Sequence, residues 1–226
     1  MPKADHQNIQ SLLQRPDIWR RASPRRHARD TIPSGYPSLD RILPGGGWSG
    51  SSITEILHDG HGLGELRLIV PALARLSRSS RWVVMISPPH IPYAPALSAC
   101  GVDLSRLLLV HGKGREDSLW ASEQALRSGT CAAVVAWPGN VPGHALRRLQ
   151  LAAEAGSSWG ILFRPGNSVR QPSPAATRIH IETDAGTSKR LVLLKARGGR
   201  PGHALGFALD PDVNLFNRSV DRPCSG

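Results

Sequence analysis

The amino-acid sequence predicts a single α/β domain built on a mostly parallel β-sheet, and three observations support this prediction. From Thr31 onward, short apolar runs rich in β-branched residues alternate with longer segments of helical period, which is typical of βα units. The apolar runs 82–86 and 132–136 do not alternate with polar residues, as expected for strands covered on both faces. The chain has 226 residues, 40% of them hydrophobic, which is enough for one sizeable core and short for two domains.

The expected elements follow one another along residues 31–195, the predicted core. Strands are expected in the interior of the sheet at residues 52–57, 82–87, 107–111, 132–137 and 159–163. Helices are expected between them at residues 65–78, 93–100, 117–128 and 143–156. The runs 178–183 and 190–195 alternate more visibly and flank the turn sequence 184–187, so they predict an antiparallel hairpin added to the sheet.

The two ends of the chain have a different composition from the core. Residues 1–30 are polar and basic, and Ile9, Leu12 and Leu13 lie at helical spacing ahead of Trp19, so they predict a short docking helix followed by a basic linker. A frayed terminus is the alternative. Residues 196–226 begin with a Gly- and Pro-rich stretch, which predicts a flexible basic tail with a short strand near residues 205–209.

Charge and cysteine content limit the class of protein. The 28 Lys and Arg residues exceed the 17 Asp and Glu residues and give a formal net charge of +11, which favours an anionic partner such as nucleic acid. Three cysteines at wide spacing fit reduced thiols better than a disulfide framework. Apolar runs too short to span a bilayer predict a cytoplasmic protein with no membrane partner. His58, His61 and His90 have no cysteine pairs or further histidines at zinc spacing, so no metal site is expected.

A glycine-rich turn follows the first core strand, where a phosphate-binding loop would lie. Its glycines are Gly60, Gly62 and Gly64, which read alone could equally be turn glycines. A working loop needs Lys and then Ser or Thr after its last glycine, but Glu65 and Leu66 stand there. The strand at 132–137 also ends in tryptophan instead of an acid that would hold a metal. We therefore expect no ATPase chemistry, no catalytic residues and no cofactor.

Two features are candidate partner surfaces. Five cations and no acid lie between residues 189 and 200, so Lys195 and the run Arg197, Gly198, Gly199 and Arg200 predict a hook for single-stranded DNA or for an acidic protein face. A solubilising tail is the alternative reading of this run. Among the tryptophans, Trp48 follows three glycines and is expected to face a partner, whereas those that begin or end apolar strands are expected in or near the core.

Several segments also carry a resemblance to known families. Residues 32–40, 45–48 and 53–56 look like the start of the RecA core. Across roughly residues 10 to 202 the chain resembles the ImuA family, the RecA-like and SulA-like accessory proteins of bacterial mutagenic translesion synthesis. The matching segments are 12–20, 64–68, 71–77, 88–97, 125–129, 147–154 and 194–202.

This resemblance implies a RecA-like fold and a non-enzymatic, SOS-induced mutasome component. Its implied partners are ImuB, a Y-family polymerase homologue, and a DnaE-type error-prone polymerase, and it leaves RecA, single-stranded DNA and a second copy open as further partners. Segments 80–82, 126–129 and 134–137 are similar to SulA, the division inhibitor that binds FtsZ, which is the alternative function. A RecA-like DNA-binding ATPase is a second alternative, against which Glu65 and Leu66 argue.

Overall fold

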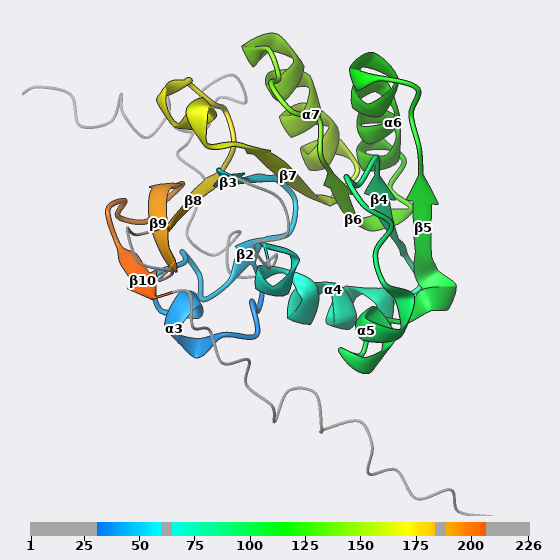
Figure 1. The fold of residues 1–226 in the computed structure, drawn as a ribbon, viewed down its shortest axis with the longest axis horizontal. Helices are drawn as coiled ribbons and strands as arrows, with labels where there is room; N and C mark the ends of the chain where they lie inside the picture. Colours follow the sequence, from blue (N-terminus) through cyan, green and yellow to red (C-terminus); the bar gives the residue numbers. More distant parts are fainter. Residues whose placement is uncertain (1–30, 60–64, 184–188, 207–226) are drawn as a thin grey trace, which may run out of the picture.

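An eight-stranded sheet forms the centre of the computed structural model, which describes residues 31–59, 65–183 and 189–206 (Figure 1). Its strand order is β10-β9-β8-β3-β7-β6-β4-β5. The parallel strands are β3 (Ile53–His58), β4 (Trp82–Ile86), β5 (Leu107–Val110), β6 (Cys131–Ala136), β7 (Trp159–Pro165) and β8 (Thr177–Thr183). The prediction of a mostly parallel α/β sheet is confirmed.

The sheet ends on one side in antiparallel strands. Strand β9 (Lys189–Ala196) runs antiparallel to β8, which confirms the predicted hairpin, and β10 (Ala204–Gly206) runs antiparallel to β9. The tail expected from residue 196 is therefore not loose at its start, because two backbone N–H groups, those of Leu193 and Gly202, bond across the turn to His203 and Leu193. Residues 207–226 lie outside the described residues.

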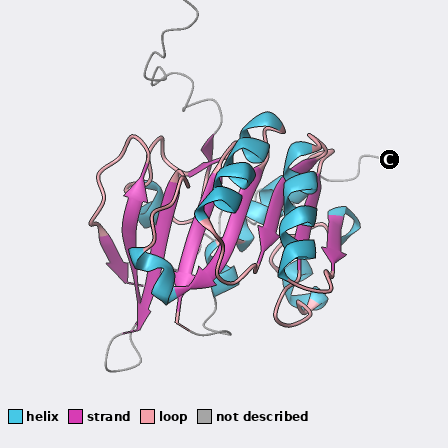
Figure 2. Cartoon of the chain, turned by 90° about the horizontal axis from the view of Figure 1, so that it is seen from above, coloured by secondary structure: helices cyan, strands magenta, loops and turns pink. Residues whose placement is uncertain are grey.

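Helices cover both faces of the sheet, and Figure 2 shows the long helices lying over the strands. One face carries α6 (Arg115–Arg127) and α7 (Gly143–Ala155), and the other carries α4 (Val70–Ser77), α5 (Ala94–Ala99) and the short α3 (Pro37–Asp40) (Figure 1). Short 3₁₀ turns are η1 (Glu65–Leu68), η2 (Leu104–Arg106) and η3 (Gly166–Arg170). The single helix expected at 65–78 is thus divided in two, since Pro71 has no backbone N–H and fits only the first turn of α4.

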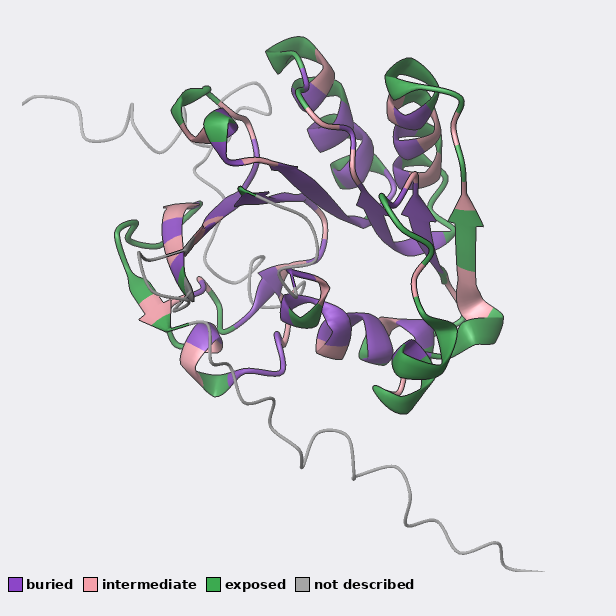
Figure 3. Ribbon diagram, in the orientation of Figure 1, coloured by how far each residue is buried: buried purple, intermediate pink, exposed green. Residues whose placement is uncertain are grey.

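The core consists of two apolar layers, one on each face of the sheet (Figure 3). The layer under α4 includes Trp48, which belongs to a two-stranded antiparallel sheet of β1 (Thr31–Ile32) and β2 (Trp48–Ser49). Trp48 is fully buried and stacks on Trp159 with ring centroids 5.4 Å apart, so the prediction that it faces a partner is wrong. The two strands approach each other closely at Gly47, where a Cβ would lie 2.3 Å from the carbonyl oxygen of Ile32, so glycine is required there.

Candidate functional site

The position of a phosphate-binding loop lies after β3, at the carboxyl edge of the sheet. Gly60, Gly62 and Gly64 lie outside the described residues. Glu65 begins η1 and is buried, and its Oε2 atom has no hydrogen-bond partner among the described residues. Leu66 packs against the core. A buried carboxylate and an aliphatic side chain therefore occupy the two positions where a nucleotide site needs a cation and a hydroxyl.

A pocket of about 600 Å³ opens at the carboxyl ends of β3, β4, β6 and β7. Three aromatic side chains line the pocket. The Trp137 ring stacks on the Phe163 ring with centroids 5.1 Å apart, and the His58 ring meets the Phe163 ring edge-on with centroids 6.0 Å apart. Trp137 stands where a metal-holding acid would be needed. Arg164 also lines the pocket, but its guanidinium is paired with Glu55. Within the described lining, no unpaired Lys or Arg is available to neutralise a polyphosphate.

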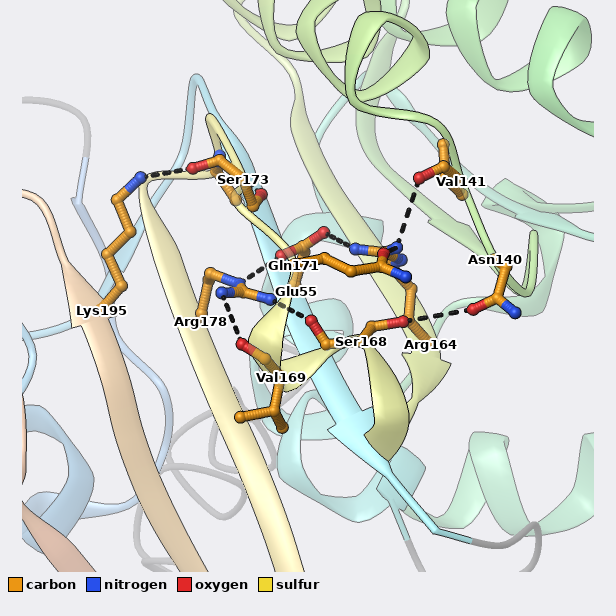
Figure 4. Close-up of polar contacts among 11 residues, drawn as sticks. Glu55, Asn140, Val141, Arg164, Ser168, Val169, Gln171, Ser173, Arg178 and Lys195 are labelled. Atoms are coloured by element: carbon orange, nitrogen blue, oxygen red, sulfur yellow. Dashed lines mark hydrogen bonds and ion pairs between the residues drawn. The ribbon is translucent and has the colours of Figure 1, made fainter.

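A buried ion network lies beside this pocket and was not expected from the sequence (Figure 4). Glu55 on β3 accepts from Arg164 Nη1 on β7 at 2.5 Å and from Arg178 Nε on β8 at 2.6 Å. The side chains of Glu55 and Arg164 are 0% exposed and that of Arg178 is 8% exposed. A charged residue inside an otherwise apolar strand is the sequence signal that could have indicated such a pair.

The two arginines also position the segment that follows β7. Arg164 donates to Gln171 Oε1 at 2.8 Å, and Arg178 donates to the carbonyl oxygen of Ser168 at 2.9 Å. Because both oxygens of Glu55 are occupied and shielded from water, this carboxylate is not free to act as an acid or base. The network connects three strands and η3 and has a structural role.

The edge of the sheet formed by β5, opposite to the edge formed by β10, exposes apolar side chains. Strand β5 was expected in the interior, but among the described strands it pairs only with β4, and Leu108 and Leu109 are 47% and 36% exposed. Trp82, expected near the core, is 39% exposed and lies under the guanidinium of Arg106 at 5.6 Å. We call the exposed side chains of Trp82, Leu104, Leu108 and Leu109, together with the half-buried Arg106, the edge surface.

A loop with two more exposed apolar side chains borders the edge surface. Ile91 and Tyr93 are among the most exposed large apolar residues of the described chain. The loop begins at Ser87, whose positive φ of 49° is rare for a residue with a Cβ. The backbone N–H of Ser87 donates to the carbonyl oxygen of Val110 at 2.8 Å, and its hydroxyl accepts from the N–H of Gly112 at 3.1 Å. The loop base is therefore attached to the end of β5.

The predicted basic hook is exposed but held against the sheet. Arg197 donates its backbone N–H to Ala176 at 2.8 Å, and its guanidinium lies 3.6 Å from Glu154 Oε1. Lys195 donates to the carbonyl oxygen of Ser173 at 2.7 Å, and burial, followed by the charges of Arg197 and Arg178, lowers its pKa. Gly198, Gly199 and Arg200 complete the exposed turn after β9. Its role as a binding element stays a prediction, as does that of Leu12, Leu13 and Trp19, which lie outside the described residues.

Two kinds of site have no candidate residues in the described segments. No described helix is both long enough and apolar enough to cross a membrane. No cluster of three or more His, Cys, Asp or Glu side chains with metal-binding geometry occurs within residues 31–59, 65–183 and 189–206.

Comparison with known proteins identifies one family. The family model described as cell division inhibitor SulA matches residues 51–160. The chain is 37% identical over 98 residues to the cell division inhibitor SulA of Edwardsiella piscicida, a match that covers 43% of this chain and 58% of that protein. It is 30% identical over 118 residues to SulA of Pectobacterium carotovorum subsp. carotovorum, which covers 52% of this chain and 70% of that protein.

The chain is also similar in sequence to a protein of solved structure. The crystal structure of SulA from Pseudomonas aeruginosa is 30% identical in sequence, with 50% of this chain and 98% of that chain covered and a TM-score of 0.43. The region matched by the family model, residues 51–160, contains the phosphate-loop position, the loop at 88–93 and the edge surface. It does not contain Trp48, Arg178 or Arg197.

Proposed function

This chain belongs to the family of the cell division inhibitor SulA, and on that premise we propose that it inhibits cell division by binding FtsZ and without catalysing a reaction. The observation that carries the proposal is the similarity over 70% of a SulA protein at 30% identity. Both the edge surface and the degenerate phosphate-loop position fall within the matched residues. The inhibitor would act in the cytoplasm, where FtsZ is found.

Binding without catalysis is supported by the residues at the carboxyl edge of the sheet. The buried carboxylate of Glu65 would repel a polyphosphate, and Leu66 offers no oxygen to magnesium. Trp137 directly follows β6, at the position where the metal-holding acid of a nucleotide hydrolase would lie. An inhibitor of this kind acts stoichiometrically, so its effect depends on its concentration relative to its target.

The edge surface is the part of the matched region best suited to hold a protein. Strand β5 offers a row of backbone groups along its open side, to which an extended segment of a partner can add as a further strand. Leu108 and Leu109 are already partly buried, so covering the rest of each side chain contributes about 1 kcal/mol of favourable free energy. Arg106 lies at the start of β5, so the matching partner segment is apolar with an acidic residue at one end.

The test is expression of the chain in dividing bacteria, with cell length and recovery of FtsZ on the tagged protein as readouts. Wild type is expected to cause filaments and to retain FtsZ. A double variant, Leu108→Asp with Leu109→Asp, is expected to lose both effects with an unchanged circular dichroism spectrum, because it places charge on an exposed apolar edge. The matched control is Leu151→Asp, since Leu151 is 53% exposed but lies on α7.

Two outcomes of this experiment would contradict the proposal in whole or in part. Normal cell length with no FtsZ recovered would exclude division inhibition. Filaments of unchanged length with the double variant would keep division inhibition but move the binding site away from the edge surface.

A second candidate is an accessory role in translesion synthesis, of the kind that the resemblance to ImuA implies. It is favoured by the structure outside residues 51–160, because β1, β2 and β8–β10 are built into the same core as the matched region. For instance, Trp48 stacks on Trp159 of β7, and Arg178 pairs with Glu55 of β3. In this proposal the RecA-like fold holds ImuB and a DnaE-type polymerase, with RecA and single-stranded DNA as further candidates.

Cells lacking the protein separate the two candidates. Loss of damage-induced mutation with normal division after damage, and recovery of the two polymerases on the tagged chain, would favour the mutasome role. ATP turnover measured on the same purified protein, with and without single-stranded DNA, is expected to be absent in both cases. Turnover stimulated by DNA would instead support the RecA-like ATPase and contradict the interpretation of Glu65 and Leu66.

A further inference from the structure

The pocket of about 600 Å³ at the carboxyl edge of the sheet lies where open α/β sheets bind their ligands. Strands β4 and β6 are neighbours, but the chain leaves β4 towards α5 on one face of the sheet and leaves β6 towards α7 on the other (Figure 1). Because the two connections diverge, they open a crevice at the ends of these strands. The pocket is lined there by Ser87 and Pro89 after β4 and by Trp137 and Gly139 after β6. It therefore occupies this crevice, and we call it the crevice pocket.

The crevice pocket has an aromatic wall, which favours a flat ligand. Trp137 stacks on Phe163, and of these two side chains Phe163 is buried whereas Trp137 is half-buried, so the indole is the ring that a ligand can reach. Indole rings stack favourably on flat aromatic rings. A volume of about 600 Å³ is large enough for a compound of drug-like size.

The charges around the crevice pocket disfavour a phosphate group on that ligand. The carboxylate of Asp59 lies in the lining. Arg164 supplies the single guanidinium of the described lining, and that group is already paired with Glu55 (Figure 4). A phosphate would therefore meet a like charge without a free guanidinium or ammonium group to offset it. An uncharged ligand avoids this cost.

Two hydrogen-bond donors of the lining lack acceptors. Trp137 Nε1 and Arg164 Nε are both buried and have no hydrogen-bond partner among the described residues. Arg164 uses its Nη1 on Glu55 and its Nη2 on Gln171 Oε1 at 2.8 Å, which leaves its Nε–H over. Buried side-chain donors without an acceptor are uncommon in folded proteins, because each one costs stability. Acceptor atoms of a ligand would satisfy both donors after small side-chain rotations of the kind that accompany binding.

We propose that the crevice pocket binds a flat, uncharged heteroaromatic compound that carries hydrogen-bond acceptors at its edge. The ring of this compound stacks on the indole of Trp137, and an acceptor at its edge takes the Nε–H of Arg164. An acceptor on a substituent that extends beyond the stacked ring takes the Nε1–H of Trp137. This binding activity does not depend on the proposed function.

The test uses saturation-transfer NMR on the purified full chain with two probes, riboflavin and adenosine, which are both flat, uncharged and rich in acceptors. At least one of them is expected to bind to wild type, and its phosphorylated form, FMN or AMP, should bind about tenfold more weakly because of Asp59. Trp137→Leu removes the stacking surface and should raise the dissociation constant about tenfold or more. Trp137→Phe keeps a ring and loses the N–H, so a rise of about threefold is expected.

A second variant and a control distinguish a lost site from a lost fold. Asn167→Trp replaces an exposed residue of the lining by a bulky one, so it should block the pocket without disturbing the core. The matched control is Trp120→Leu, because Trp120 is a 64% exposed tryptophan on α6, outside the lining, and this variant should bind the probe like wild type. Circular dichroism checks the fold of each variant, and if Trp137→Leu unfolds, Asn167→Trp decides the test.

Three results would overturn the proposal. The first is the absence of saturation transfer to both probes at about 200 µM, where a ligand with a micromolar dissociation constant would occupy most of the protein. The second is wild-type affinity for the probe in Asn167→Trp. The third is binding of FMN or AMP at least as tight as that of the unphosphorylated probe, which would show that the pocket accepts a phosphate.

Discussion

Glu55→Gln tests the buried ion network most directly. The substitution keeps the size of the side chain but leaves Arg164 and Arg178 without their shared carboxylate, in a site where the side chains are 0% and 8% exposed. Removing one partner of a buried pair costs about 3–5 kcal/mol, because the remaining charge stays buried without compensation. A domain has only about 5–15 kcal/mol of stability, so this single change removes a large share of it.

Urea denaturation followed by circular dichroism measures the loss. With a slope of about 3 kcal/mol per M, a loss of 3–5 kcal/mol lowers the midpoint by about 1–1.7 M urea. The control is Glu182→Gln, because Glu182 pairs with Arg190 at 2.7 Å on the exposed part of the sheet, where an ion pair contributes at most about 1 kcal/mol. Adding Arg164→Met to Glu55→Gln removes one uncompensated charge and should recover part of the loss.

Two results would refute this reasoning. If Glu55→Gln changed the midpoint no more than Glu182→Gln, the network would contribute no more than a surface pair. If the double variant with Arg164→Met were less stable than Glu55→Gln alone, the uncompensated guanidinium would not be the source of the cost.

Three further predictions concern the core. Trp48→Ala removes a fully buried stacked indole and should cost about 3–5 kcal/mol, measured as a lower thermal midpoint than wild type. Gly160→Ala should cost about 1–3 kcal/mol in the same assay, since its Cβ would lie 2.2 Å from Ile53 Cδ1, and a wild-type midpoint would show that the layer can adjust. Burial raises the pKa of the Tyr36 phenol, which donates to the carbonyl oxygen of Arg67 at 2.6 Å. Its stabilisation is therefore complete at neutral pH and declines as pH rises through the tyrosine range, a decline that Tyr36→Phe should remove in alkaline titrations followed by circular dichroism.

The order and type of the main elements could be predicted from the sequence because each apolar run is long and separated by clear turn signals. The position of a strand within the sheet could not. The run Leu107–Val110 is as apolar as the interior strands, and only the strand order shows that it lies at an edge. The prediction that Trp48 faces a partner was wrong for a related reason, since three glycines indicate a turn but not the direction in which the next side chain points.

The candidate site was predictable only where local residues decide its chemistry. Glu65 and Leu66 disable the phosphate-loop position whatever the rest of the chain does. Glu55, in contrast, pairs with Arg164 and Arg178 across 109 and 123 positions of the sequence, so the network depends on which strands become neighbours. The edge surface likewise appears only when the sheet order is known.

The stacked pair of Trp48 and Trp159 also gives the protein an intrinsic circular dichroism signal. Two indoles with centroids 5.4 Å apart and planes inclined by 26° couple their electronic transitions, and such a chiral pair contributes to circular dichroism. One indole belongs to the two-stranded β1–β2 sheet and the other to β7 of the central sheet. The signal therefore reports whether residues 31–49 remain docked, and it does so without any label, even when the helical content of the protein is unchanged.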